Sequence, residues 1–289
     1  MNAEQYLRDG DLQETMTQLQ QQIRQEPANP RLRVFLFQLL AVTGAWERAL
    51  NQLGVAGELD ASTLPMVQTY REALRCEVLR AKVFAGHRSP LVFGDPEPWL
   101  ALMFQALTVT AAGEHAQASE LRGRALDAAP ATGGRLDGQP FQWLMDADSR
   151  LGPILEVIVN GRYYWIPFQR IRSIQVEKPE DLRDLVWMPA AFTWANGGET
   201  VGLIPTRYPG SESHPDPLIQ LARKTDWLEP APGVYLGQGQ RMLTTDADDH
   251  ALMDVRRIEL ETHGDPATDA VAEPAAGGGR RDSSTPWLS

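Results

Sequence analysis

Apolar residues in the first 130 positions of the chain recur with the spacing of amphipathic helices. Between residues 11 and 27, Leu12, Met16, Leu19 and Ile23 fall on one helical face, with mostly polar residues between them. Apolar positions three or four residues apart indicate a helix with one side buried. The same kind of pattern predicts further helices over residues 29–44, 44–53, 64–86, 97–113 and 113–130.

Three glycines separate predicted helices at nearly regular intervals. Gly10 and Gly44 are 34 residues apart, and Gly113 follows Gly44 by 69 residues, close to two further periods. Glycine permits the tight turn of a helical hairpin, and this period is typical of tetratricopeptide (TPR) repeats. We therefore predict an N-terminal domain of TPR-like helical hairpins over residues 1–132. An ordinary helical bundle with coincidental spacing is the alternative.

The pattern changes to that of β-strands beyond a segment rich in glycine and proline at residues 129–140. Short runs of β-branched and aromatic residues follow, and Asn160-Gly161 between two of them is a strong hairpin signal. Strands are predicted at residues 141–148, 154–159, 162–167 and 171–177. A short helical turn is predicted at 179–185, and two more strands are predicted in each of the segments 186–208 and 239–260. The prediction is a mainly antiparallel α+β domain with short helices over residues 133–262. Residues 263–289 are poor in core-forming residues and are predicted to be a disordered tail.

Charge and cysteine content narrow the classes of partner and compartment. The formal net charge of the 289 residues is -11, and an acidic surface argues against nucleic acid as a partner. Cys76 is the only cysteine, which fits a reducing compartment such as the cytoplasm. Its helical context predicts a small buried residue rather than a nucleophile. No apolar run approaches the ~18 residues of a membrane helix, and the N-terminus lacks signal-peptide features, so membrane insertion is not expected.

Two aspartates near the start of the second domain are the strongest candidates for chemistry. Asp146 and Asp148 are predicted to share one face of an extended strand, which Arg150 continues. Paired carboxylates serve as acid and base in hydrolases when burial raises the pKa of one of them. The neighbouring arginine favours a structural ion-pair network instead, and Asp148→Ala is then predicted to cause a folding defect. A hydrolase using Asp146 and Asp148 is the alternative.

Metal and cofactor motifs are not found in the sequence. A calcium loop counted from Asp146 would place Leu151 and Val157 where glycine and glutamate are required. His250 stands in an acidic segment, which a hairpin loop explains better than a metal site. The Gly-x-Ser-x-Gly, phosphate-loop and dinucleotide motifs are also missing. The sequence therefore predicts no metal, no cofactor and no catalytic residue.

Large aromatic residues crowd the second half of the chain. They are Trp143, Tyr163, Tyr164, Trp165, Trp187, Trp194 and Trp227. Because strand side chains alternate between two faces, these rings cannot all enter one core. Some of them either line a groove that anchors a partner or pack under the helical domain, and both interpretations stay open.

Several strings of residues resemble the ImpE family, in order and in spacing. They are residues 35–53, 70–86, 93–103, 146–167, 179–190 and 202–212. The resemblance covers nearly all of residues 1–260, and it is specific because uncommon strings recur together. It implies a helical-repeat domain followed by an α+β domain, and it supplies no catalytic residues.

The resemblance also implies a function. Proteins of this family resemble non-enzymatic cytoplasmic adaptors of the bacterial type VI secretion system. The implied partner is the N-terminal helix of the small contractile-sheath subunit, with a link to the ClpV-type ATPase that disassembles the sheath. A general TPR-type chaperone unrelated to secretion is a further alternative. We predict that the partner-binding groove contains Trp143, Tyr164, Arg183, Trp187 and Trp194.

Overall fold

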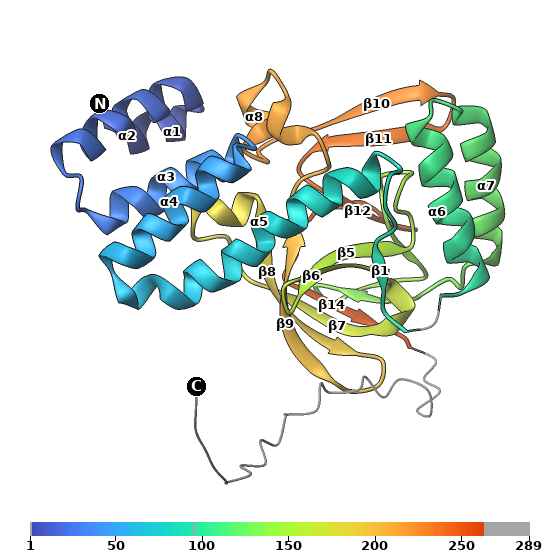
Figure 1. Ribbon diagram of the computed structural model, residues 1–289. Coiled ribbons are helices and arrows are strands. Elements are labelled where there is room, and N and C mark those ends of the chain that lie inside the picture. The colour runs from blue at the N-terminus through green and yellow to red at the C-terminus, as the bar shows by residue number, and fades with distance from the viewer. Residues whose placement is uncertain (1, 95, 263–289) are drawn as a thin grey trace, which may run out of the picture.

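The computed structural model describes residues 2–94 and 96–262 (Figure 1). Its first part is helical, as the apolar periodicity predicts. The helices are α1 (Ala3–Asp9), α2 (Leu12–Gln25), α3 (Pro30–Val42), α4 (Trp46–Leu59), the short η1 (Ala61–Thr63), α5 (Leu64–Phe84), α6 (Pro98–Ala111) and α7 (His115–Ala128). The predicted disordered tail, residues 263–289, lies outside the described residues.

Glycine ends three of these helices and lets the chain turn into the next one. Gly10, Gly44 and Gly113 have φ values of 84°, 68° and 84°, in the left-handed region that favours glycine. The hairpins α1–α2, α3–α4 and α6–α7 form around them. The predicted glycine turns are therefore confirmed, while the assignment of the hairpins to TPR repeats stays a prediction.

The second part of the chain is built on an antiparallel-rich sheet, which confirms the predicted α+β class. Within the described residues, the main sheet has nine strands in the order β1-β6-β5-β9-β8-β7-β14-β2-β3. Their bounds are β1 (Leu91–Val92), β2 (Gly134–Leu136), β3 (Gln139–Phe141), β5 (Ile154–Val159), β6 (Arg162–Pro167), β7 (Ile171–Val176), β8 (Trp187–Trp194), β9 (Glu199–Pro205) and β14 (Arg257–Leu260). Strand β1 comes from the helical part of the sequence and pairs in parallel with β6, so the two parts share one sheet.

Smaller elements complete the second part. A three-stranded sheet contains β4 (Leu144–Asp146), β12 (Met242–Thr245) and β13 (Asp249–Ala251), and a two-stranded ribbon contains β10 (Thr225–Ala231) and β11 (Val234–Gly239). Short helices are η2 (Phe168–Arg170), η3 (Leu182–Leu185), η4 (Ser211–Ser213) and α8 (Pro217–Gln220). The helical turn at η3 confirms the prediction for that segment, whereas the sequence pattern did not reveal the β10–β11 ribbon.

The hairpin between β5 and β6 follows directly from its turn sequence. Asn160 and Gly161 both have positive φ, at 49° and 70°, which matches the right-handed twist of the two strands. Val159 pairs with Arg162 across the turn, and Ile154 pairs with Pro167 at the far end. The predicted Asn-Gly hairpin is thus confirmed with its register.

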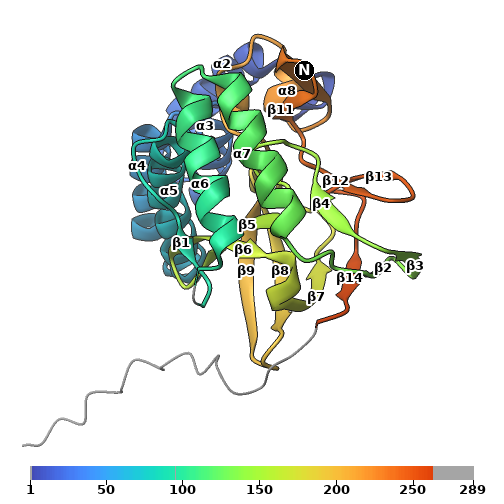
Figure 2. The same cartoon turned by 90° about the vertical axis from the view of Figure 1, so that its right-hand side faces the viewer.

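Both faces of the main sheet are covered by apolar side chains. One face packs against the helices, which gather on one side of β5, β6, β8 and β9 (Figure 2). Large residues of this core are Phe37, Leu53, Tyr70, Trp99, Trp165 and Trp187. The opposite face forms a second core, in which Val157, Ile166, Phe192 and Ile258 of the main sheet cluster with Leu243 of β12. Successive side chains along each strand point to opposite faces, so they contribute to two cores rather than to one core and one solvated face.

Candidate functional site

The five residues of the predicted partner-binding groove do not lie together. Trp187 and Trp194 are 0% and 5% exposed, and they enter opposite faces of β8. Tyr164 is partly buried on β6 and packs edge-on against Phe93, while Trp143 lines a small cavity beside the start of β4. Of the five, Arg183 alone lines a groove between the helices and the sheet.

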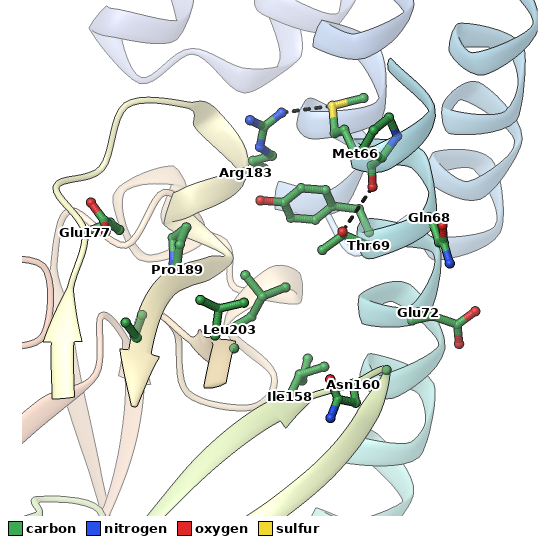
Figure 3. A pocket seen from close by; sticks show the side chains of 17 residues that line it. Met66, Gln68, Thr69, Glu72, Ile158, Asn160, Glu177, Arg183, Pro189 and Leu203 are labelled. Atoms are coloured by element: carbon green, nitrogen blue, oxygen red, sulfur yellow. Dashed lines mark hydrogen bonds between the residues drawn. The ribbon is translucent and has the colours of Figure 1, made fainter. Parts of the chain in front are cut away.

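That groove, here called the α5 groove, lies between the N-terminal half of α5 and the sheet, and has a volume of about 970 Å³ (Figure 3). Strands β8 and β9 form its floor, and the tip of the β5–β6 hairpin closes one end. Its lining residues are Pro65, Met66, Gln68, Thr69, Tyr70, Glu72, Ile158, Asn160, Gly161, Glu177, Arg183, Pro189, Ala190, Ala191, Val201, Gly202 and Leu203.

The floor of the α5 groove is apolar and open to solvent. Val201 is 75% exposed, which is unusual for a valine within a central strand. Pro189 and Ala191 lie on neighbouring β8, where Ala191 pairs with Val201. A Cβ atom at Gly202 would lie 2.9 Å from the carbonyl oxygen of Ile158, so glycine is needed for the close approach of β9 to β5. Small side chains therefore leave space above the floor.

Charged side chains stand at the rim of the groove. Glu72 and Glu177 lie on opposite sides of it (Figure 3). Arg183 forms an ion pair with Asp181, donates a hydrogen bond to Met66 Sδ at 3.0 Å, and places its guanidinium over the Tyr70 ring at 5.0 Å. These contacts fix Arg183 between the sheet and α5. Glu72 forms an ion pair with Arg75 at 2.7 Å, and Glu177 is exposed and forms no ion pair within the described residues, so the two carboxylates still outnumber the one arginine of the lining.

Trp187 supports the α5 groove from below. Its ring packs against Tyr70 with centroids 5.7 Å apart, and its Nε1 donates a hydrogen bond to Glu77 at 2.9 Å. Burial is the largest influence on Glu77 and raises the pKa of its carboxyl, against the attraction of Arg80. The aromatic stack thus ends in a buried ionic network that joins α5 to the sheet.

The centre of this network is Glu156, which is fully buried in β5. Arg80 of α5 donates to its two oxygens at 2.7 and 3.0 Å, and Tyr163 and Arg241 also donate to them. Arg241, 0% exposed, donates in addition to Asp146 and to the carbonyl oxygen of Pro205. Each buried charged group has an oppositely charged partner and hydrogen bonds. Burial of an ion without such partners would be strongly unfavourable.

Electrostatics keep Glu156 ionised in this network. Burial by itself would raise the pKa of its carboxyl, but Arg80 and Arg241 outweigh burial and lower it to about 2. The same environment raises the pKa of the Tyr163 hydroxyl, through burial first and the Glu156 charge second. Tyr163 therefore stays neutral and serves as a hydrogen-bond donor.

Asp146 and Asp148 belong to the edge of the same network. Strand β4 ends at Asp146, so Asp148 lies in the following turn and the two do not share a strand face. Asp148 accepts two hydrogen bonds from the Arg150 side chain and one from Gly237 N at 2.7 Å, whereas Asp146 is held by Arg241. The predicted geometry was therefore wrong, because a turn rather than a strand follows Asp146. Each carboxylate forms an ion pair with its own arginine. This is the structural ion-pair network that the sequence favoured over a catalytic pair.

Replacing Asp148 with alanine is expected to destabilise the fold by about 2–3 kcal/mol, because Arg150 and the Gly237 amide would lose a charged acceptor. Urea denaturation of the purified protein measures the change. Asp249→Ala is the matched control, since Asp249 is exposed. Equal stability of the two variants would contradict the structural role of Asp148.

The members of the network had a weak signal in the sequence. Glu156 interrupts the apolar run 154–159, and Arg80 interrupts the apolar face of the helix at 64–86. A charged residue inside an apolar run indicates a buried ion that needs a partner. The sequence gives no indication that Arg241 is that partner.

Other groups of the described residues offer little for chemistry. No cluster of three or more histidine, cysteine or acidic side chains there has the arrangement of a metal site. Cys76 is 4% exposed, which confirms the predicted burial, and burial raises the pKa of its thiol to about 12. None of the helices in this part of the chain combines the length and apolar character needed to cross a bilayer.

Comparisons with known proteins cover most of the chain. The profile of the family described as ImpE protein matches residues 138–259. The chain is 54% identical over 261 residues to the type VI secretion system accessory component TagJ of Pseudomonas aeruginosa, covering 90% of this chain and 92% of that protein. The fold is similar to the crystal structure of protein VPA1032 from Vibrio parahaemolyticus, with a TM-score of 0.82 and 24% identity over 90% of this chain and 97% of that one.

Proposed function

The chain belongs to the ImpE family, and on this premise we propose that it is a non-enzymatic cytoplasmic adaptor of a bacterial type VI secretion system. Its proposed partner is the N-terminal helix of the small contractile-sheath subunit. The family relationship supports the accessory role, since the 54% identical relative carries that description. The α5 groove is the observation that supports helix binding.

An α-helix with its side chains is about 10–12 Å across, and an amphipathic helix binds by laying its apolar face into an apolar groove. The α5 groove offers such a floor at Val201, Pro189 and Ala191. Helix α5, which forms one wall, is tied to the sheet through the buried Arg80–Glu156 pair. A preformed groove reduces the ordering cost of binding.

The charge of the rim favours one kind of partner helix. Glu72 and Glu177 stand on opposite sides of the groove, and the chain as a whole carries a net charge of -11. Complementary charges speed association and fix orientation. We therefore propose that the bound helix has basic residues flanking its apolar face. Of the predicted partner-binding residues, Arg183 belongs to this groove in the proposal, and Trp187 supports it from beneath.

The adaptor is also proposed to connect the sheath to its ClpV-type disassembly ATPase. Family membership supports this second link. The non-enzymatic part of the proposal is supported by Asp146 and Asp148, because each carboxylate is buried and committed to an arginine. Asp146→Asn is expected to leave binding of the sheath helix unchanged, provided that the variant is shown to be folded.

Val201→Arg is expected to weaken binding of the sheath-subunit helix at least about tenfold, because a long cation would fill the groove and repel a basic partner. Val201 is highly exposed, so the substitution leaves the core intact. A fluorescently labelled peptide of the helix and anisotropy titration measure the affinity. The control is Leu228→Arg on β10, a substitution of similar chemistry at a residue that is 51% exposed.

Equal affinities of the wild-type protein and the Val201→Arg variant would place the helix elsewhere. Loss of affinity in both arginine variants would indicate a nonspecific charge effect. A pull-down from a lysate that contains the sheath, with and without the N-terminal helix of the small subunit, distinguishes this adaptor from a general chaperone. A general chaperone would retain its binding when the helix is deleted.

A further inference from the structure

A second hollow lies at the other end of the helical part, where α1 and α3 meet η1 and the loop that precedes η3. Its volume is about 500 Å³, and we call it the α1–α3 cleft. Leu7, Leu32, Phe35 and Leu182 form apolar walls, all of them partly exposed. The cleft is separate from the α5 groove, because η3 stands between them: Leu182 lines the cleft and the next residue, Arg183, lines the groove.

Gln38 lines the α1–α3 cleft and carries a side-chain amide without a hydrogen-bond partner among the described residues. The residue is 6% exposed. The amide atoms are not fully enclosed by protein, so they belong to the small exposed part of Gln38. Because Gln38 lines the cleft, its amide opens into it. An amide donates and accepts hydrogen bonds, which matches a peptide group.

The rim of the cleft is acidic. Glu4, Asp60, Glu180 and Asp181 line it, with Arg31 as the single cation of the lining. Glu4 and Glu180 are exposed and form no ion pair within the described residues. Hydrogen bonding from Ser62 lowers the pKa of Asp60, which therefore stays ionised. Because carboxylates outnumber cations at the rim, the α1–α3 cleft attracts positively charged ligands to its apolar walls.

We propose that the α1–α3 cleft binds a basic polypeptide segment of a second partner, apart from the helix assigned to the α5 groove. An apolar side chain of this segment enters between Leu7 and Phe35, and one of its peptide groups pairs with the Gln38 amide. Lysine or arginine residues on either side of it face Glu4 and Glu180. This arrangement gives a peptide-group partner to the Gln38 amide, which has no hydrogen-bond partner among the described residues. The inference does not depend on the proposed function of the α5 groove.

The test uses a labelled peptide of alternating leucine and lysine as the probe, and the same peptide with glutamate in place of lysine. Anisotropy titration of the full chain is expected to show binding of the lysine peptide that weakens as salt is added. The double variant Glu4→Lys/Glu180→Lys is expected to lose about tenfold or more in affinity. The matched control is Glu120→Lys/Asp127→Lys on the exposed face of α7, which changes the net charge by the same amount.

Gln38→Leu tests the amide separately, because leucine has a similar size and no polar group. This variant is expected to keep the melting temperature of the wild-type protein or exceed it, and to bind the lysine peptide several-fold more weakly. These titrations are made in the Val201→Arg background, because the α5 groove as proposed accepts an apolar segment with basic flanks and would take up the same peptide. Equal loss in both double variants, equal binding of the glutamate peptide, unchanged binding by Gln38→Leu, or no binding of the lysine peptide by Val201→Arg itself would each overturn the proposal.

Discussion

Replacing Arg241 with methionine is expected to destabilise the protein by about 3–5 kcal/mol. Arg241 is fully buried and donates to Asp146 and Glu156, so its loss leaves two buried carboxylates short of a cation. Methionine fills much of the space but supplies no charge and no hydrogen bond. Urea denaturation monitored by tryptophan fluorescence measures the change, which is a large part of the stability of an ordinary domain.

The control for this variant is Arg257→Met. Arg257 also forms an ion pair with a carboxylate, that of Glu259, but its side chain is 55% exposed. An exposed pair contributes about 0–1 kcal/mol, because water replaces the lost partner. Similar losses in the two variants would mean that burial does not set the importance of Arg241, and would refute the role given to the network.

Trp187→Ala is expected to cost about 3–5 kcal/mol, the usual range for removing a buried aromatic ring. The Trp187 ring is 0% exposed and packs against both Tyr70 and Trp46. Its indole nitrogen also satisfies Glu77, so truncation leaves a cavity beside a buried carboxyl group. The floor of the α5 groove loses its support in the same step.

Thermal unfolding and peptide affinity should be measured together for this variant. We expect the melting temperature to fall and the affinity for the sheath helix to fall only as far as the folded fraction does. Trp227→Ala is the control, because Trp227 is 36% exposed on the β10–β11 ribbon. A Trp187→Ala protein with wild-type stability and lost affinity would instead mean that the ring contacts the partner directly.

The candidate site could be predicted from the sequence only in part. Arg183 was named with the aromatic residues as part of a predicted partner-binding groove. It lines the α5 groove, and its contact with a partner stays a prediction. Trp187 and Trp194 were chosen for their chemistry, but both point into cores. The composition of a strand does not reveal whether a second layer covers each face, and here a core covers both Trp187 and Trp194 on their opposite faces of β8.

The local turns and the family relationship of this protein follow from the order of its residues alone. Gly10, Gly44 and Gly113 turn the helical hairpins, and Asn160-Gly161 turns the β5–β6 hairpin, because each turn needs a backbone conformation that few residues adopt. These signals lie within a few neighbouring residues, so they can be read without knowing the fold.

The way in which distant residues combine depends on packing across the whole fold. Arg80 and Glu156 are 76 positions apart, and Glu156 and Arg241 are 85 positions apart, yet they form one buried network. The α5 groove likewise needs a helix from the first part and strands from the second. Periodicity reports which side of an element is buried, but not which other element buries it, since that depends on packing across the whole chain. The partners of a buried charge and the walls of a groove are therefore set by the assembled fold.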